Sequence, residues 1–263
     1  DQGDITIADG ASSGTLTMNS GKALNTGGSL SGAGALTVVS GATLNLSAGG
    51  LSNTGAILVD GALNWTGGTI TGPGSLDVNG VLSVTGSNGR TLDGRLLNHT
   101  NASGSSLWDA QGTWNLNNGA VFKNAAGAKF NFTNVGGADL NSSAGSGTFD
   151  NQGMLTKSGA GTIRIGPSGT VAFNNTGTID VTGGTLQFFD SNTFVSTAFT
   201  LGSGATVQMM NGSTSDFQGT TTLSGAGSVL QLDGGSTNTI SSGTLTMNSG
   251  TALNTGGSVS GAG

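Results

Sequence analysis

The chain has 263 residues, of which 51 are Gly and none is Cys, with 8% charged residues and a net charge of −6. Gly, Ser, Thr and Asn compete with helix formation, so this composition excludes an ordinary α-helical or α/β protein. The acidic balance leaves no basic stripe for nucleic acid or anionic membranes, and a hydrophobic content of 34%, spread evenly, argues against disorder. A repetitive all-β protein remains.

Short apolar stretches separated by Gly and Asn follow one another from the N-terminus in rounds of about 20 residues. The predicted strands are 15–18, 23–24 and 29–30, then 35–38, 43–46 and Leu51, then 57–59, 63–65 and 69–70, then 75–78 and 81–84. Three short strands per round, each with one apolar side, are typical of a parallel β-helix (β-solenoid). Gly and Asn suit corners where the chain takes a positive φ.

A meander of hairpins is the alternative that short strands and frequent turns leave open. Hairpins favour two-residue turns such as those at Asn79-Gly80, Asp60-Gly61 and Asn118-Gly119. These dipeptides are too few and too irregularly placed to organise the chain, so the solenoid is preferred.

Two stretches break the rhythm, 97–112 and 188–200, and are predicted to be loops or insertions. All 10 Phe lie between Phe122 and Phe217. This shift in composition predicts a wider core filled by stacked aromatic rings, with an irregular segment that presents a binding surface as the alternative.

A long repeat is the strongest feature of the sequence. Residues 12–34 read SSGTLTMNSGKALNTGGSLSGAG and residues 241–263 read SSGTLTMNSGTALNTGGSVSGAG, so only two positions differ. We therefore predict one continuous solenoid over 1–263, in which 12–240 is one repeat unit of about 229 residues and 241–263 begins the next copy. At about 20 residues per coil, the unit would hold 11 or 12 coils and measure about 55 Å.

The scarcity of charge fits this architecture. Equivalent residues of stacked coils lie about 4.8 Å apart, so a repeated charge would form a column of like charges. Neutral Thr, Ser and Asn avoid this repulsion and form hydrogen-bonded ladders.

One segment resembles a known family. Residues 154–165 read MLTKSGAGTIRI, which is similar to the autotransporter-associated β-strand repeat, and 175–181 with 184–186 continue in the same style. The wider chain resembles the β-helical shafts of bacterial autotransporter passengers and filamentous-haemagglutinin-type adhesins. This resemblance implies a right-handed parallel β-helix, extracellular or on the bacterial cell surface, that serves adhesion or scaffolding.

Catalysis finds little support in the residues. General acid–base chemistry needs two titratable groups that converge. Two pairs could meet across neighbouring coils, Asp139 with Asp150 and Asp180 with Asp190, but solvated turns are the preferred interpretation. His99 is expected to be an ordinary loop residue, and a zinc site is disfavoured by one His and no Cys. We therefore predict no enzymatic activity and no catalytic, cofactor-binding or metal-binding residues.

The main hypothesis is a structural shaft or filament segment of a tandem-repeat surface protein. Its expected partners are head-to-tail neighbouring copies of the repeat, in the same chain or by self-assembly, and host or matrix glycans, without nucleic acid and without a membrane span. One alternative is a glycan-binding or polysaccharide-degrading β-helix module. A lesser alternative is an ice-binding solenoid, suggested by paired threonines at 15 and 17, 220 and 222, 237 and 239, and 244 and 246.

Overall fold

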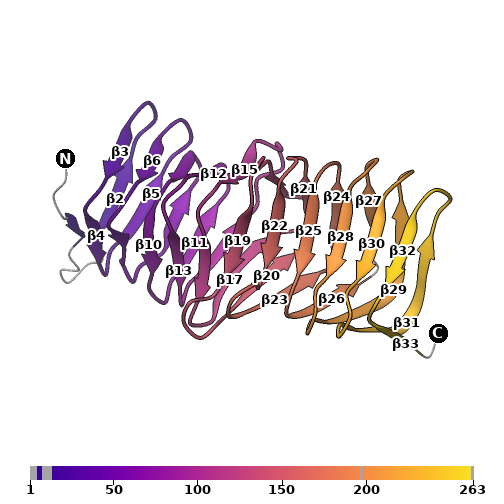
Figure 1. The fold of residues 1–263 in the computed structure, drawn as a ribbon. Helices are drawn as coiled ribbons and strands as arrows, with labels where there is room; N and C mark the ends of the chain where they lie inside the picture. Colours follow the sequence, from indigo (N-terminus) through magenta and orange to yellow (C-terminus); the bar gives the residue numbers. More distant parts are fainter. Residues whose placement is uncertain (1–4, 8–13, 196–197, 262–263) are drawn as a thin grey trace.

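The computed structural model describes residues 5–7, 14–195 and 198–261. These residues form an all-β parallel β-solenoid of about 11 turns, with roughly 23 residues per turn and three strands per coil. The coils stack from the N-terminus to the C-terminus into an elongated body (Figure 1). The predicted fold class is confirmed.

Each coil visits three faces in the same order, which we call face 1, face 2 and face 3. Face 1 contains β2 (Thr15–Met18), β5 (Ala35–Val38), β8 (Ile57–Val59), β11 (Ser75–Val78), β14 (Leu96–His99), β17 (Ala120–Asn124), β20 (Ser146–Asn151), β23 (Thr170–Asn175), β26 (Ser191–Val195) and β33 (Ser258–Gly261). Face 2 contains β3 (Ala23–Thr26), β6 (Thr43–Leu46), β9 (Ala62–Trp65), β12 (Val81–Gly86), β15 (Ser106–Ala110), β18 (Lys129–Phe132), β21 (Met154–Lys157), β24 (Thr178–Val181) and β27 (Ala198–Leu201).

Face 3 is a single 12-stranded sheet. It contains β1 (Ile5–Ile7), β4 (Ser29–Gly32), β7 (Gly50–Leu51), β10 (Gly68–Thr71), β13 (Arg90–Asp93), β16 (Trp114–Asn117), β19 (Ala138–Asn141), β22 (Thr162–Ile165), β25 (Thr185–Phe188), β28 (Thr206–Met209), β30 (Val229–Leu232) and β32 (Ala252–Thr255). Two long strands, β29 (Thr214–Ser224) and β31 (Thr237–Met247), run from face 1 into face 2 and join those faces into one 21-stranded sheet.

Neighbouring strands on every face pair in parallel, as β2, β5 and β8 do on face 1. A hairpin meander is thereby excluded, because hairpins pair antiparallel. The three dipeptides that suggested hairpin turns lie at corners, where Asn118 adopts a φ of 54° and Gly119 one of 80°.

The corner glycines have a second role that the sequence argument did not foresee. Gly61 and Gly80 follow face 1 in successive coils and are not among the positive-φ glycines. A Cβ on Gly80 would lie 1.6 Å from the carbonyl oxygen of Gly61, and one on Gly61 would lie 2.1 Å from that of Ala42. These corners therefore need Gly because the backbones of adjacent coils approach closely.

Inward-pointing side chains of all three faces form one continuous core. Leu36, Leu44 and Leu51 in one coil are completely buried, and the same alternation continues along the stack. In the middle, aromatic rings contact one another from coil to coil. Phe122 and Phe149 are stacked with ring centroids 4.9 Å apart, and Phe149 and Phe173 meet edge to face with centroids 5.1 Å apart. The predicted aromatic core is confirmed.

Coil length varies along the stack, and the coils around Phe122 and Phe149 are longer than the predicted 20 residues. Leu82 pairs with Leu63, 19 positions earlier, whereas Phe149 pairs with Phe122, 27 positions earlier. Aromatic content alone does not set the length, because Asn192 pairs with Phe173, 19 positions earlier, in a coil that also contains Phe188 and Phe194. Because the longer coils use more residues, the repeat holds fewer than the expected 11 or 12 coils.

The prediction of loops or insertions is correct for residues 100–105, which form no strand, but both predicted stretches also contain strands. The first, 97–112, contains the end of β14 and all of β15, and the second, 188–200, contains β26 and most of β27. Residues 196–197 lie outside the described part of the chain. His99 also departs from the prediction, because it ends β14 and its side chain is completely buried in the core.

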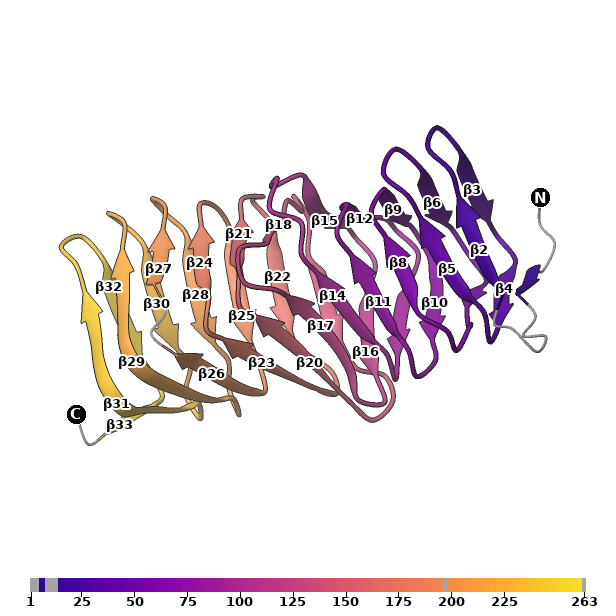
Figure 2. The same cartoon turned by 180° about the vertical axis from the view of Figure 1, so that it is seen from behind.

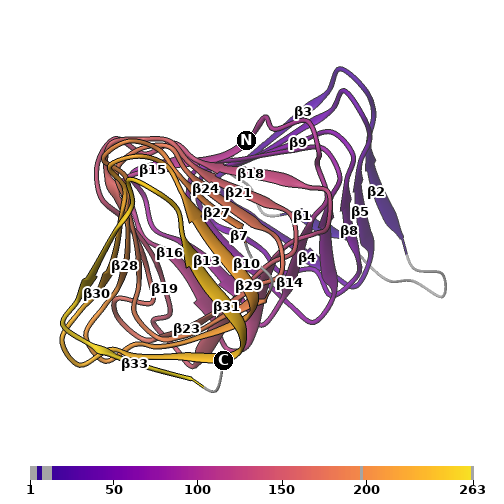
Figure 3. The same ribbon diagram turned by 90° about the vertical axis from the view of Figure 1, so that its right-hand side faces the viewer.

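The stack of coils turns along its length, as the views in Figures 2 and 3 show. Figure 2 shows the face 1 strands β5, β8, β11 and β14 in succession. In Figure 3 the last coils, with β31 and β33 in yellow, outline the cross-section, while the N-terminal strands β2, β3 and β5 lie to one side. The stack therefore turns along its length, as twisted sheets do.

Candidate functional site

A line of polar side chains runs along the outside of face 1. In order, its members are Asp77, Asn98, Lys123, Asp150, Asn174, Thr193, Asp216 and Thr239, each paired in register with the next. We call these residues the face 1 polar stripe. No two like charges are adjacent along it, which is how stacked strands limit repulsion. The sequence predicted ladders of neutral residues. On face 1 the stripe also contains charged residues, and amide and hydroxyl side chains separate those of like charge.

The stripe is hollowed near its C-terminal end. An open groove of about 380 Å³ is lined by Ser191, Asn192, Thr193, Thr214, Ser215, Asp216, Thr237 and Thr239. Burial raises the pKa of Asp216, but hydrogen bonds from Gln218 and Ser241 outweigh it and leave the pKa below its ordinary value. The groove therefore offers one carboxylate among hydroxyl and amide groups, a chemistry suited to hydrogen-bonding a polyhydroxylated ligand.

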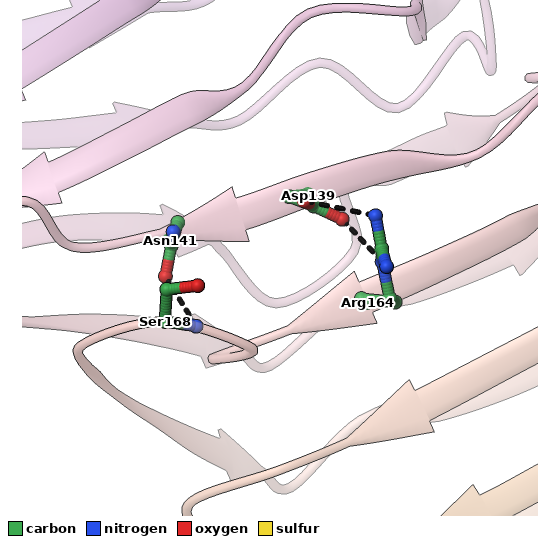
Figure 4. A network of polar contacts seen from close by, with 4 residues as sticks. All are labelled: Asp139, Asn141, Arg164 and Ser168. Carbon is green, nitrogen blue, oxygen red and sulfur yellow. Dashed lines mark hydrogen bonds and ion pairs between the residues drawn. The ribbon is translucent and has the colours of Figure 1, made fainter.

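An ion pair marks the outside of face 3 (Figure 4). Arg164 on β22 donates from Nε to Oδ1 of Asp139 at 2.5 Å and from Nη2 to Oδ2 at 3.0 Å. Nearby, Oδ1 of Asn141 accepts a hydrogen bond of 2.9 Å from the backbone N–H of Ser168. Both contacts join adjacent coils, whose register is given by the backbone pairing of β19 with β22.

The carboxylates that sequence reasoning paired are separated by the fold. Asp139 lies on face 3 and Asp150 on face 1, whereas Asp180 lies on face 2 and Asp190 at the corner between faces 3 and 1. The assignment to turns was wrong for Asp139, Asp150 and Asp180, which lie in strands. Within the described ranges, no three His, Cys, Asp or Glu side chains gather where they could hold a metal ion.

Burial changes the acidity of two of these groups. It raises the pKa of Asp180, and it raises that of Asp190, where the backbone N–H of Val171 donates a hydrogen bond of 2.8 Å and partly offsets the effect. On face 2, Asp180 pairs in register with Thr156 and Thr200, so its strand neighbours are hydroxyls rather than carboxylates.

An internal amide ladder was missed by the sequence analysis. Asn124 donates to Oδ1 of Asn151 at 2.7 Å, Asn151 donates to Oδ1 of Asn175 at 2.6 Å, and Asn175 donates to the carbonyl of Gly177 at 3.0 Å. These three asparagines are completely buried at the ends of successive face 1 strands. The detectable signal is a recurring Phe-x-Asn, which begins at Phe122, Phe149 and Phe173.

His99 forms the N-terminal end of this ladder. Its Nδ1 lies 2.9 Å from Oδ1 of Asn124. Because that oxygen can only accept, Nδ1 carries the proton and the imidazole is the Nδ1–H tautomer when neutral. Burial lowers the pKa of His99, and the hydrogen bond to Asn124 partly offsets this effect.

Three buried cations bind backbone carbonyls at the corners. Arg90 donates from Nη2 to the carbonyl of Gly86 at 2.8 Å, Arg95 donates from Nε to that of Gly72 at 3.3 Å, and Lys157 donates to that of Gly183 at 3.1 Å. Burial lowers the pKa of Arg90 to about 10 and that of Lys157 to about 8. Arg95 and Lys157 thereby join adjacent coils, and Arg90 does so through a second bond, from Nε to the carbonyl of Trp65 at 3.2 Å.

The C-terminal edge exposes apolar side chains that belong to the core. Leu253 on β32 is 40% exposed and Val259 on β33 is 46% exposed, whereas Leu30, the counterpart of Val259 in the first copy, is 1% exposed. Both point toward the solenoid interior, because they pair with the buried residues Leu230 and Asn238. Both are therefore inward-facing residues of the last described coil.

The threonine pairs do not form one lattice. Thr15 and Thr17 lie on face 1, whereas Thr220 and Thr222 lie on face 2 beside the pair at 244 and 246. A flat ice-binding array needs such a pair on the same face in many successive coils. In the described coils, the face 2 arrangement spans two layers.

Comparison with known proteins gives limited information. No protein-family model matches the chain, and no curated protein matches it. Among solved structures, a match is the "TibC-catalyzed hyper-glycosylated TibA55-350 fragment", with 18% identity over 98% of both chains and a TM-score of 0.26.

Proposed function

We propose that the chain is a shaft segment of a secreted or cell-surface bacterial tandem-repeat protein with an adhesive or scaffolding role and without catalytic activity. The observation that carries this proposal is the C-terminal edge. Its residues 244–261 repeat 15–32, on which the coil of β5, β6 and β7 is already stacked. The edge is thus a surface whose complementary layer exists elsewhere in the same sequence.

The packing supports continuation by another copy. Leu245, Met247, Leu253 and Val259 point into the core or its open end, and covering them removes apolar surface from water at about 25 cal/mol per Å². The unpaired backbone groups of β31, β32 and β33 gain hydrogen-bond partners at the same time. A following copy of 35–59, in the same chain or in a second subunit, provides both.

The test is a chain extended at Gly263 by a second copy of residues 35–263, measured by small-angle X-ray scattering. The proposal expects a rod whose maximum dimension exceeds that of the single chain by about 50 Å, since stacked coils rise about 4.8 Å each. Two separately tumbling bodies, or a compact particle, would contradict a continuous shaft.

A matched pair of substitutions tests whether the edge becomes core. In the extended chain, Val259→Asp is expected to disrupt the junction, because its counterpart Leu30 is 1% exposed. Val135→Asp is the control, since Val135 is 75% exposed and lies at a corner away from the edge. Equal thermal stability of the two variants would argue against burial of the edge.

Surface location needs its own test. Bacteria that produce the parent protein are expected to lose this segment to external protease while their cytoplasmic markers remain intact. Protection of the segment in intact cells would contradict the proposed location.

A glycan-binding module is the second candidate, and the groove around Asp216 favours it. The face 1 polar stripe contains no aromatic residue, so recognition of a sugar there would depend on hydrogen bonds from Thr193, Asp216 and Thr239. A glycan array probed with the chain and with Asp216→Asn tests this candidate. Binding that Asp216→Asn weakens supports a lectin-like role, whereas turnover of a bound polysaccharide would support a degrading enzyme.

A further inference from the structure

The two copies of the repeated sequence occupy different faces of the solenoid. In the first copy, Thr15–Met18, Ala23–Thr26 and Ser29–Gly32 lie on faces 1, 2 and 3. In the second copy, 244–247 pairs on face 2 with 220–223, β32 lies on face 3, and β33 returns to face 1. The second copy is therefore advanced by one strand position.

The shift by one strand position does not change which side chains of the repeat point inward. Leu16, Met18 and Leu24 point inward in the first copy, and their counterparts Leu245, Met247 and Leu253 are aligned in register with inward residues of the preceding coil. Alternation along each strand decides which side chains point inward, and it is independent of the face on which the strand lies. Each strand of the repeated sequence is thus accommodated on two different faces.

The cause is the length of the repeat. Between Thr15 on β2 and Thr244 on β31, the chain completes ten coils and then one further strand. A repeat with a whole number of coils would return to the same face. The remaining strand moves the start of each copy onward by one face.

We infer that successive copies of the 229-residue repeat start one face further around the shaft, so that three copies are needed before the original arrangement returns. This inference rests on the proposed tandem shaft. Its consequence is an interaction surface that faces several directions: the groove around Asp216 lies on face 1 in this unit, on face 2 in the next, and on face 3 in the third.

The arrangement suits a long, flexible, polyhydroxylated polymer, because the groove offers hydroxyl and amide groups around one carboxylate. A ligand that binds one groove meets equivalent grooves of later copies on the other sides of the shaft. Binding through several copies gains avidity only where the linker or polymer can span the sites. A long flexible polymer can wrap the shaft, whereas a short rigid ligand reaches one groove.

Cysteine pairs test the face assignment in the 263-residue chain, which has no native Cys. Gln231 and Asn254 are outward neighbours on face 3, so Gln231→Cys with Asn254→Cys is expected to oxidise to a disulfide. If the second copy kept the faces of the first, Asn254 would instead lie beside Thr222 on face 2. Thr222→Cys with Asn254→Cys is therefore the discriminating pair, and Gln208→Cys with Gln231→Cys is the positive control.

The outcomes separate this inference from the proposed function. Oxidation of the 231/254 pair at a rate within a few-fold of the 208/231 control, without oxidation of the 222/254 pair, supports the advance by one face. Oxidation of the 222/254 pair, or of neither test pair while the control oxidises, overturns it. A rod-like scattering profile of the extended chain tests the shaft itself, because a continuous stack is rod-like whichever face each copy starts on.

Discussion

Replacing Asn151 by Ala removes the middle member of the internal amide ladder. The substitution breaks the 2.7 Å bond that Asn151 accepts from Asn124 and the 2.6 Å bond that it donates to Asn175. Each buried hydrogen bond broken on one side costs about 1–3 kcal/mol. Asn124 keeps a bond of 3.1 Å to the carbonyl of Met154, which limits its share of the loss. We expect the free energy of unfolding to fall by about 2–4 kcal/mol.

A ladder of asparagines on the outside of face 2, formed by Asn25, Asn45 and Asn64, supplies a control with the same chemistry. Asn45 accepts from Asn64 at 2.7 Å and donates to Asn25 at 2.6 Å on the outside of face 2. Water replaces both partners when Asn45 is changed to Ala, so the expected loss is within about 0.5 kcal/mol. Urea denaturation followed by the fluorescence of the three buried tryptophans measures both variants. Equal losses for Asn151→Ala and Asn45→Ala would refute the claim that burial gives the inner ladder its strength.

Four further outcomes are expected. Because burial lowers the pKa of His99 in the folded state, the unfolded chain binds a proton at His99 more readily as the pH drops through about 6.5. The urea concentration at the unfolding midpoint is therefore expected to fall over this range, and His99→Gln is expected to remove this pH dependence. The pKa of Lys157 is about 8 in the folded chain and 10.5 in the unfolded chain. The free energy of unfolding is therefore expected to rise by about 3 kcal/mol between pH 8 and 10.5, and Lys157→Met is expected to abolish this rise. Phe149→Ala should cost about 3–5 kcal/mol by urea denaturation, since its ring touches those of the coils on both sides. Asp139→Asn should change the free energy of unfolding by less than about 1 kcal/mol, because its exposed pair with Arg164 is solvated; a larger loss would mean that the pair locks the coils together.

The N-terminal coils were predictable in detail. The strands expected at 15–18, 35–38 and 43–46 were found with those bounds. Here Leu, Val and Met alternate with Thr and Asn, and corner Gly residues separate the strands, so local periodicity suffices. Prediction was weaker where the core is aromatic, since coils there lengthen and 97–112 departs from the rhythm of 20.

The buried polar side chains could not be predicted from the local sequence pattern. His99, Lys157 and Asn151 are residue types that usually face water, and alternation alone assigned no partner to them. Their burial depends on acceptors or donors in the next coil, such as Asn124 for His99 and Gly183 for Lys157, which lie about 25 residues away in the chain. The candidate groove around Asp216 likewise joins three separate coils and has no continuous sequence motif.

The sequence by itself determined the stacked, three-stranded coil, the inward side of each strand and the existence of the long repeat. These follow from alternation, corner residues and identity between 12–34 and 241–263, all of which are local or directly visible. Only the tertiary structure decided on which face each strand lies. That choice depends on the accumulated lengths of all preceding coils, from 19 to 27 residues, and a remainder of one strand in the repeat is enough to turn the second copy onto the next face.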